Sequence, residues 1–346
     1  MRGAETAMRR VTIKDIAQIA GVSYATVSRA LSGSPEISEQ TRSRILDICR
    51  KEGYRANVLA RSLIRSKTNV LGLIIPDVTN PFYSELSLGI ETYARSLGYN
   101  VMLCNSLRND DTTAQLFDFL IGHQVDGIIL ANSYSEAKNW VHKYSSTIPI
   151  VLLSDAIDDS EGGGINAVSV DNLEGGRLAA EYLYALGHRK ILYFGFRPSS
   201  VTHQMRFRGF CKALDPFGIV PEIIENPADS SSIANGYALG KTLFQRGFDG
   251  TAIFAAADSL ALGVLQAADE FGVAVPEDIS LFGFDNIIYS SLPKIMLSTI
   301  DQRKQLLAEA AVNILMEILN HPERDEFTHR LIRPTLVIRR SCRALE

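Results

Sequence analysis

The chain has 346 residues, enough for two or three domains with sizeable hydrophobic cores. Its content of 46% hydrophobic and 21% charged residues is typical of a soluble globular protein and excludes a disordered or fibrous chain. The formal net charge of −4 hides an asymmetry, because residues 1–67 carry 13 Lys and Arg against 6 Asp and Glu, and the remainder carries 22 against 33. A basic head on an acidic body is typical of a protein whose head alone contacts nucleic acid.

The four cysteines are widely spaced and have no neighbouring histidine cluster, so we expect no disulfide framework, no metal site and no cofactor. The start of the chain has no apolar signal region, and no run approaches the roughly 18 apolar residues of a membrane span. We therefore expect a cytoplasmic protein without a membrane partner.

The stretch from Thr12 to Ser32 predicts two short helices joined by a three-residue turn. Apolar residues recur at helical spacing after Thr12, an N-cap residue, and Gly21 stands just past the end of the first helix. Ser23 then caps a second helix, and Val22 and Val27 are spaced as a hydrophobic staple that fixes the direction in which this helix starts.

The second helix has one packing face and one outward face. On a helical wheel Ala25, Ser28 and Arg29 point outward, with Tyr24 at the margin. Small residues and one Arg at a helix start suit the DNA major groove, where Arg pairs with guanine and an apolar group contacts the thymine methyl. The alternative is an ordinary helical hairpin with a solvated face.

Two further helical segments follow. Ser38 opens a third helix, which runs to about residue 52 and ends at Gly53. Residues 57–63 have helical character, but a helix this short is marginal in water and needs a partner to form. The alternative is a flexible linker.

From residue 70 the pattern becomes a repeated alternation of apolar strands and amphipathic helices. Strands are predicted at 70–76, 99–106, 126–131, 148–154, 167–171, 190–195, near 222, at 252–256, 279–284 and 331–339, and helices at 81–97, 113–123, 173–186, 206–214, 233–246, 259–271 and 306–319. Two such runs imply two α/β lobes, each with a doubly wound parallel sheet and right-handed crossovers. Ligands of such folds bind beyond the carboxyl ends of the strands.

Several motifs together resemble those of the lac/galactose repressor family of bacterial transcription regulators. They read TIKDIAQIAGVSYATVSRALSG, PDVTNPFYSEL, GHRKI, ADSLALG and PEDISLFGFDN, and the similarity covers nearly the whole chain. The resemblance implies a helix-turn-helix headpiece, a hinge helix and a periplasmic-binding-protein-like core of two lobes. It also implies a homodimer that binds a pseudo-palindromic double-stranded operator and is switched by a small-molecule effector, most often a sugar or sugar derivative.

The resemblance assigns the DNA contacts to two segments. The headpiece contacts would come from Thr12, Ser23, Tyr24, Ala25, Thr26, Ser28 and Arg29. In the hinge helix Leu63 would wedge a base step open in the minor groove, with Asn57 and Ala60 beside it.

The implied effector contacts are Phe82, Tyr83, Asp155, Arg206, Asp258 and Asp285. Aromatic rings can cover the apolar face of a sugar, while a carboxylate and a guanidinium bind its hydroxyls. For Arg206 and Asp285 the alternative is a structural salt bridge between the lobes, and aromatic residues at a helix start are usually core. Ala257 and Ser154 stand where the family usually has polar or acidic residues, so the usual hexose pocket is in doubt.

We expect a disordered extension at 1–8, the headpiece at 9–56, the hinge helix and linker at 57–68, and the core at 69–346. One lobe would span about 69–164 and 297–323, and the other about 165–296 and 324–346. The chain would cross between the lobes near 160–170, near 290–300 and close to the C-terminus.

Two other functions compete with the repressor hypothesis. A transport-type binding protein could use the same two-lobed core, but the missing signal peptide and the basic headpiece argue against it. An enzyme on the same frame is disfavoured because we find no GxSxG motif, no P-loop and no GxGxxG that opens a helix after a strand.

Overall fold

The structure, a computed structural model, describes residues 11–31, 34–54, 67–132, 137–153, 164–228, 230–324 and 326–345. The chain divides into two compact units, residues 1–68 and 69–346. The hinge residues Asn57, Ala60 and Leu63, the predicted extension and Asp155 all lie outside the described residues.

The first unit contains the predicted three helices, α1 (Ile13–Ala20), α2 (Tyr24–Leu31) and α3 (Glu39–Lys51). Their shared core is centred on Ile16, Val27 and Ile45, which are fully buried. Gly21 ends α1 in the left-handed conformation, with φ 64°, and its N–H donates to carbonyls in the last turn of α1. Glycine adopts this conformation without strain, so the chain can turn sharply into α2. The helix-turn-helix prediction is confirmed.

The first lobe of the second unit is a six-stranded parallel sheet in the order β11-β5-β4-β3-β1-β2. Its strands are β1 (Val70–Ile75), β2 (Asn100–Asn105), β3 (Gly127–Ala131), β4 (Ile150–Leu153), β5 (Ala167–Val170) and β11 (His329–Ile332). Its helices are α5 (Pro81–Ser96), α6 (Asp110–Gly122), α7 (Ala137–Tyr144) and α12 (Lys304–Asn320). Side chains alternate along β1, so Leu73 packs with the α5 and α12 core and Ile74 with the α6 and α7 core.

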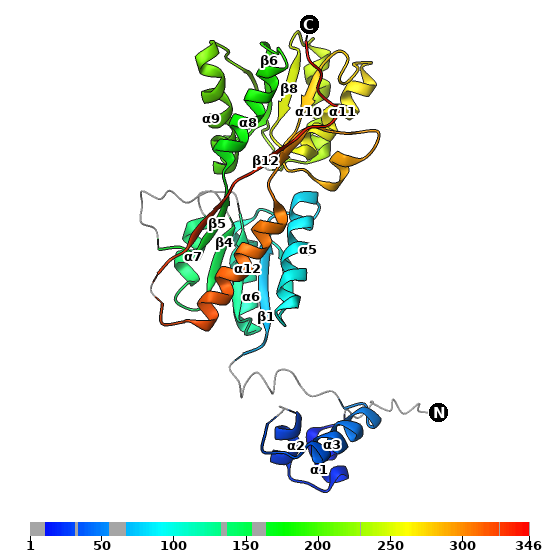
Figure 1. Cartoon of the computed structure of the whole chain (residues 1–346), viewed down its shortest axis with the longest axis vertical. Coiled ribbons are helices and arrows are strands. Elements are labelled where there is room, and N and C mark those ends of the chain that lie inside the picture. The colour runs from blue at the N-terminus through cyan, green and yellow to red at the C-terminus, as the bar shows by residue number, and fades with distance from the viewer. Residues whose placement is uncertain are drawn as a thin grey trace, which may run out of the picture. The chain divides into compact units, whose positions relative to one another are not determined.

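The second lobe is a four-stranded parallel sheet in the order β7-β6-β8-β9. Its strands are β6 (Ile191–Phe196), β7 (Glu222–Glu225), β8 (Ala252–Ala255) and β9 (Ser280–Phe282). Its helices are α8 (Asn172–Ala185), α9 (Val201–Leu214), α10 (Ile233–Gln245) and α11 (Asp258–Glu270). Figure 1 shows α8 and α9 on one side of this sheet and α10 and α11 on the other. Two short 3-10 helices, at Asp215–Phe217 and Ile288–Ser291, follow α9 and β9 respectively.

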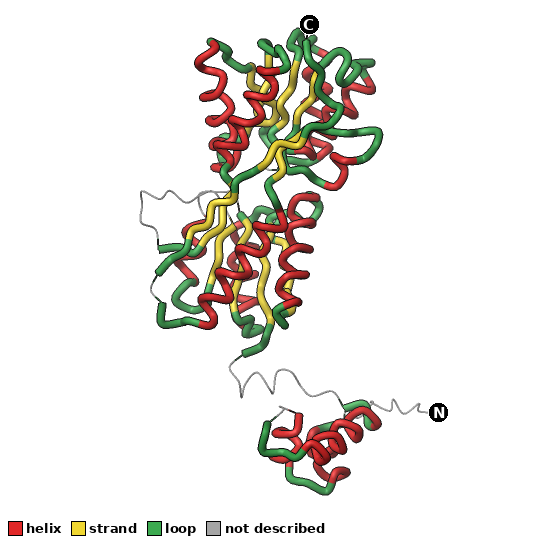
Figure 2. The backbone as a smooth tube through the Cα atoms, in the orientation of Figure 1, coloured by secondary structure: helices red, strands yellow, loops and turns green. Residues whose placement is uncertain are grey.

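The chain passes between the lobes at three places, and β10 (Thr299–Asp301) pairs antiparallel with β12 (Thr335–Val337) there. Figure 2 shows these two strands between the main sheets. The predicted lobe boundaries were wrong in three places. Residues 165–170 and 324–332 supply β5 and β11 to the first-lobe sheet, and Leu297 and Ile300 join the second-lobe core. Strand pairing decides these boundaries, and the apolar pattern does not encode it.

Four elements also differ from the predictions, and one of them is the short strand β10, which no predicted strand covers. The predicted strand 331–339 is two strands in different sheets, because Pro334 follows β11 and lacks the N–H that would continue the ladder. Helix α7 was missed. Helix α9 begins at Val201 and not at Arg206, because Ser200 caps it by accepting from the N–H of His203.

Candidate functional site

The outward face of α2 is exposed as predicted. Tyr24, Ala25 and Arg29 are exposed, and Thr26 and Ser28 are half-buried. The Arg29 Nε lies 3.4 Å from the Glu36 carboxylate, and both side chains are more than half exposed. An exposed ion pair of this kind is weak, so Arg29 can exchange this partner for another.

Two of the predicted DNA-contacting residues, Thr12 and Ser23, also cap the helix ends. The Thr12 hydroxyl donates to Asp15 at 2.7 Å and accepts from the Asp15 N–H, while the Thr12 N–H donates to the same carboxylate at 2.8 Å. The Ser23 hydroxyl accepts from the Thr26 N–H at 3.1 Å. Their hydroxyl groups therefore fix the entry of each helix, and this role is present without DNA.

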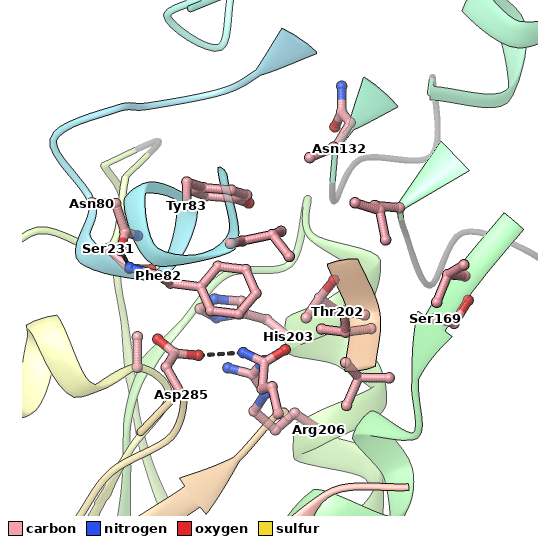
Figure 3. Close-up of a pocket in the computed structure, with 18 of the residues that line it drawn as sticks. Asn80, Phe82, Tyr83, Asn132, Ser169, Thr202, His203, Arg206, Ser231 and Asp285 are labelled. Atoms are coloured by element: carbon pink, nitrogen blue, oxygen red, sulfur yellow. Dashed lines mark hydrogen bonds between the residues drawn. The ribbon is translucent and has the colours of Figure 1, made fainter. Parts of the chain in front are cut away.

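A cavity of about 100 Å³ lies between the two lobes of the core. A cavity of this volume has room for several water molecules or for a small ligand. The first lobe contributes the aromatic rings of Phe82 and Tyr83 from the start of α5, and the second contributes Arg206 and Asp285 (Figure 3). The cavity lies beyond the carboxyl ends of the parallel strands, which is where ligands of such sheets bind. Polar lining residues also include Asn80, Asn132, Ser169, Thr202, Ser231 and Gln302.

The two aromatic residues owe their position to the N-cap of α5. The Asn80 side chain accepts from the Phe82 N–H at 3.0 Å, and Pro81 stands in the first turn. The two rings meet edge to face, with centroids 5.2 Å apart and planes at 77°. They form an apolar wall that can cover one face of a sugar or heterocycle.

Arg206 is 3% exposed and is held in place on every side. Its Nε and Nη2 donate to Asn172 Oδ1 at 3.0 and 2.8 Å, its Nη1 donates to the Ala256 carbonyl, and its guanidinium carbon lies 3.4 Å from the centroid of the Phe284 ring. The guanidinium is therefore preorganised before any ligand arrives.

Two glycines allow α8 and α9 to approach closely enough for these bonds. A Cβ on Gly176 would lie 2.0 Å from the Arg206 carbonyl oxygen, and one on Gly209 would lie 1.9 Å from that of Leu173. Only glycine fits at either position, so α9 brings Arg206 directly against Asn172 at the start of α8.

Asp285 is 5% exposed and lies in strained backbone, with φ 123°. Its carboxylate accepts from the Gln302 side-chain amide, and its N–H donates to the Ile300 carbonyl at 2.8 Å. Burial raises the pKa of Asp285 to about 7, with Asp258 adding to the rise and Arg206 and Lys304 opposing it. A carboxyl that titrates near neutral pH in a cleft is typical of a ligand site.

Asp258 does not line the cavity, and its assignment as an effector contact is corrected. The side chain is fully buried, and its oxygens accept from the Ile287 N–H at 3.0 Å and from the hydroxyls of Ser290 and Thr299 at 2.6 Å each. The carboxylate thus ties α11 to the loop after β9 and to β10. Arg206 and Asp285 both belong to the second lobe, so the alternative of a salt bridge between the lobes is also wrong.

Sequence reasoning missed three basic residues of the lining, Arg108, Arg197 and His203. Arg197 comes directly after β6 and Arg108 lies three residues after the end of β2, so the strand-end rule could have found them. His203 precedes Arg206 by three residues on α9, which places both on one helix face. Ala257 also lines the cavity.

Within the described residues, no three His, Cys, Asp or Glu side chains are grouped so that they could hold a metal ion. None of the helices in the described ranges is both long and apolar enough to cross a membrane.

The core matches a family profile described as periplasmic binding proteins and the sugar-binding domain of the LacI family, over residues 68–340. Residues 12–57 match the profile of the bacterial regulatory proteins of the lacI family. Together the two profiles cover the headpiece and both lobes.

Individual relatives agree with these profiles. The chain is 33% identical over 318 residues to catabolite control protein A of Priestia megaterium, which covers 90% of this chain and 93% of that protein. It is 31% identical over 339 residues to the transcriptional repressor PurR of Mannheimia succiniciproducens, covering 96% and 99%.

Among solved structures, the lac repressor dimer bound to operator and the anti-inducer ONPF matches with a TM-score of 0.86 and 27% identity, covering 97% of this chain and all of that one. A LacI-family regulator from Enterococcus faecium with bound ribose matches with a TM-score of 0.71 and 27% identity, covering 80% and 100%. The chain therefore belongs to the lacI family of bacterial regulatory proteins.

Proposed function

We propose that this protein is a transcription regulator, chiefly a repressor, that binds a pseudo-palindromic operator as a homodimer and is switched by a small molecule in the cavity between its lobes. The observation that carries the proposal is that one chain combines an exposed helix-turn-helix face with a cavity lined by aromatic, guanidinium and carboxyl groups. The function is binding alone and includes no chemical step, and its place of action is the cytoplasm, where operator DNA lies.

The proposed DNA contact rests on α2 and on the charge asymmetry. Arg29, with the small residues Ala25 and Ser28, faces outward on a helix whose other side is fixed by the headpiece core. One such module reads few base pairs, and a two-fold dimer doubles the contacts on a palindromic site. Of the structural relatives, the lac repressor is solved as a dimer on its operator.

The first lobe also presents an apolar surface that suits a second copy of the chain. Strand β2 is at the edge of its sheet, with Leu103 46% exposed, and Leu88 on α5 and Leu107 after β2 are 66% and 69% exposed. An exposed edge strand beside large apolar side chains is a liability for a monomer. A symmetric interface over this surface would bury them.

The hinge assignment remains part of the proposal. We infer that Leu63 wedges a base step in the minor groove, with Asn57 and Ala60 beside it, when two hinge segments fold together on the operator. An effector that prefers one arrangement of the lobes would shift the balance between operator-bound and free protein.

Selection from a library of random pseudo-palindromic duplexes, followed by fluorescence anisotropy on the enriched sequence, tests the DNA-binding proposal. We expect one enriched palindrome, bound at least about 10³-fold more tightly than random DNA at the same salt concentration. Leu63→Ala should weaken binding to the enriched sequence far more than binding to random DNA. Only sequence-independent, salt-sensitive binding by the unmodified protein would refute the proposal.

A further inference from the structure

His203 is a buried histidine in the wall of the cavity between the lobes. It lines the cavity together with Thr202 and Arg206 of the same helix, α9, and it is 5% exposed (Figure 3). Its Nδ1 has no hydrogen-bond partner within the described part of the chain. Buried polar atoms are rarely left unpaired, so this nitrogen indicates a partner that does not belong to the chain.

The start of α9 and the end of β6 fix the position of this ring. The hydroxyl of Ser200, a fully buried residue, accepts a hydrogen bond from the His203 N–H at 3.4 Å and caps the helix. Gly195 lies where the register of β6 against β7 shifts, and its φ of 85° is a conformation that glycine adopts without strain. The His203 ring forms a hydrogen bond with the Gly195 backbone. The imidazole is therefore held in one orientation before a ligand binds.

The surroundings of the imidazole also assign its proton. The pKa of His203 lies well below its usual range, first because of burial and then because of the positive charges of neighbouring arginines, so the ring is neutral at pH 7. The bond with Gly195 opposes this shift, as it does where the ring donates to a carbonyl oxygen. Since Nδ1 has no partner, the donating nitrogen is Nε2. The Nδ1 of this neutral tautomer is then a hydrogen-bond acceptor.

A buried acceptor is satisfied by a ligand that carries a hydrogen-bond donor. A carboxylate or a carbonyl group offers only acceptors, so it would face the Nδ1 lone pair with no proton between them. A hydroxyl group donates to Nδ1 and can accept from another group at the same time. The rest of the lining suits a hydroxylated molecule, because it combines the aromatic wall of Phe82 and Tyr83 with side-chain hydroxyls and amides.

We propose that His203 is a specificity-determining residue of this cavity, and that its Nδ1 accepts a hydrogen bond from one hydroxyl group of a neutral, hydroxylated effector. This inference rests on the proposed function and names the group of the effector that the cavity selects. A deoxy or O-methyl analogue would displace water from the cavity and leave Nδ1 unpaired. The expected loss of affinity for such an analogue is about 5- to 100-fold.

Thermal-shift titrations of the full chain with D-glucose, D-galactose, D-ribose and D-xylose identify a sugar that binds. A ligand that binds only the folded state raises Tm by mass action. Each monodeoxy and mono-O-methyl analogue of the binding sugar is then titrated in the same way. We expect one hydroxyl position at which both analogues bind about 5- to 100-fold more weakly than the sugar itself.

Three variants test whether His203 reads that hydroxyl. His203→Leu removes the acceptor and should bind the sugar and its weakest analogue with nearly equal affinity. His203→Asn keeps an amide oxygen close to the position of Nδ1 and should keep most of the discrimination. The matched control His142→Leu, at an exposed histidine of α7, should behave as the unmodified protein. A merely structural role of His203 would weaken both ligands alike and leave the ratio of their affinities unchanged.

Nitrogen-15 NMR of the histidine rings keeps the proposal testable if His203→Leu fails to fold. The signal that disappears in His203→Asn identifies the His203 ring. In the unmodified protein its Nδ1 should resonate as an unprotonated nitrogen at pH 7, and this resonance should move upfield when the sugar binds. A protonated Nδ1, or an Nδ1 resonance that the bound sugar leaves unchanged, would overturn the proposal.

The outcomes separate this inference from the proposed function. No saturable rise of Tm with any of the four sugars overturns the inference even when operator binding is intact. Discrimination that persists unchanged in His203→Leu also overturns it, because another group would then read the hydroxyl. A lack of sequence-specific operator binding in the unmodified protein would instead refute the proposed function.

Discussion

The Glu85 carboxylate accepts a hydrogen bond from the backbone N–H of Ile288 at 2.8 Å. Glu85 lies on α5 in the first lobe, and Ile288 lies in the turn that follows β9 in the second. The other carboxylate oxygen lies 3.4 Å from Lys304 Nζ, which itself donates to the carbonyls of Asp285 and Asn286. One side chain therefore joins both lobes next to the strained loop that carries Asp285.

Two replacements of Glu85 should weaken this contact to different extents. Glu85→Ala removes the acceptor and the charge and should lower the free energy of unfolding by about 1–2 kcal/mol, whereas Glu85→Gln keeps an acceptor and should lose less. Urea denaturation measures both losses of stability. The control is Glu181→Ala, which removes an exposed ion pair on α8. A loss in Glu85→Ala no larger than in Glu181→Ala would mean that the contact is only a surface pair.

Asp258 should be essential for stability. Asp258→Ala leaves the buried donors of Ile287, Ser290 and Thr299 without their acceptor and should cost about 3–5 kcal/mol in guanidinium denaturation. Asp258→Asn, which keeps one oxygen, should cost less and remain folded. If Asp258→Ala keeps its stability but loses effector binding, Asp258 contacts the effector, as the sequence analysis predicted.

Asp285 should make stability depend on pH. Its folded pKa of about 7 lies above the ordinary value of about 3.9. The folded state therefore holds the proton more strongly, and the stability that this proton supplies is complete below about pH 4 and lost as pH rises through 7.

Asp285→Asn does not titrate, so it should be more stable than the parent by about 2–4 kcal/mol at pH 8, with the difference shrinking towards pH 4. Chemical denaturation across this range measures it. Asp249→Asn, at an exposed acid whose pKa is lowered by Lys190, should show no gain over the same range. A difference that stays constant between pH 4 and 8 would contradict an elevated pKa at Asp285.

Arg29 should contribute sequence specificity and not merely charge. Arg29→Ala should weaken binding to the selected operator by about 1–3 kcal/mol while changing binding to random DNA much less. Arg50→Ala, at an exposed arginine of α3 that pairs with Asp47, is the matched charge control. If both variants lose the same affinity for both DNAs, Arg29 contacts phosphate and not a base.

The headpiece could be predicted almost to the residue because its signals are local. The cap residues Thr12 and Ser23, Gly21 at the turn and the apolar spacing act within a few residues of each other, and the structure has the helices where these signals place them. The wall formed by Phe82 and Tyr83 could also be located, because a strand that ends directly before a helix N-cap points to the ligand edge of a parallel sheet.

The sequence by itself determined the helix-turn-helix, the α/β alternation and the strand ends at which a ligand cavity forms, since each depends on contacts between near neighbours in the chain. Only the tertiary structure decided that β5 and β11 belong to the first lobe, that Asp258 turns inward to Ser290 and Thr299, and that Arg197 and His203 line the same cavity as Arg206. These relationships join residues that lie far apart in the chain or on different elements. Strand pairing and burial fix them, and no local pattern records which distant partner a side chain will meet.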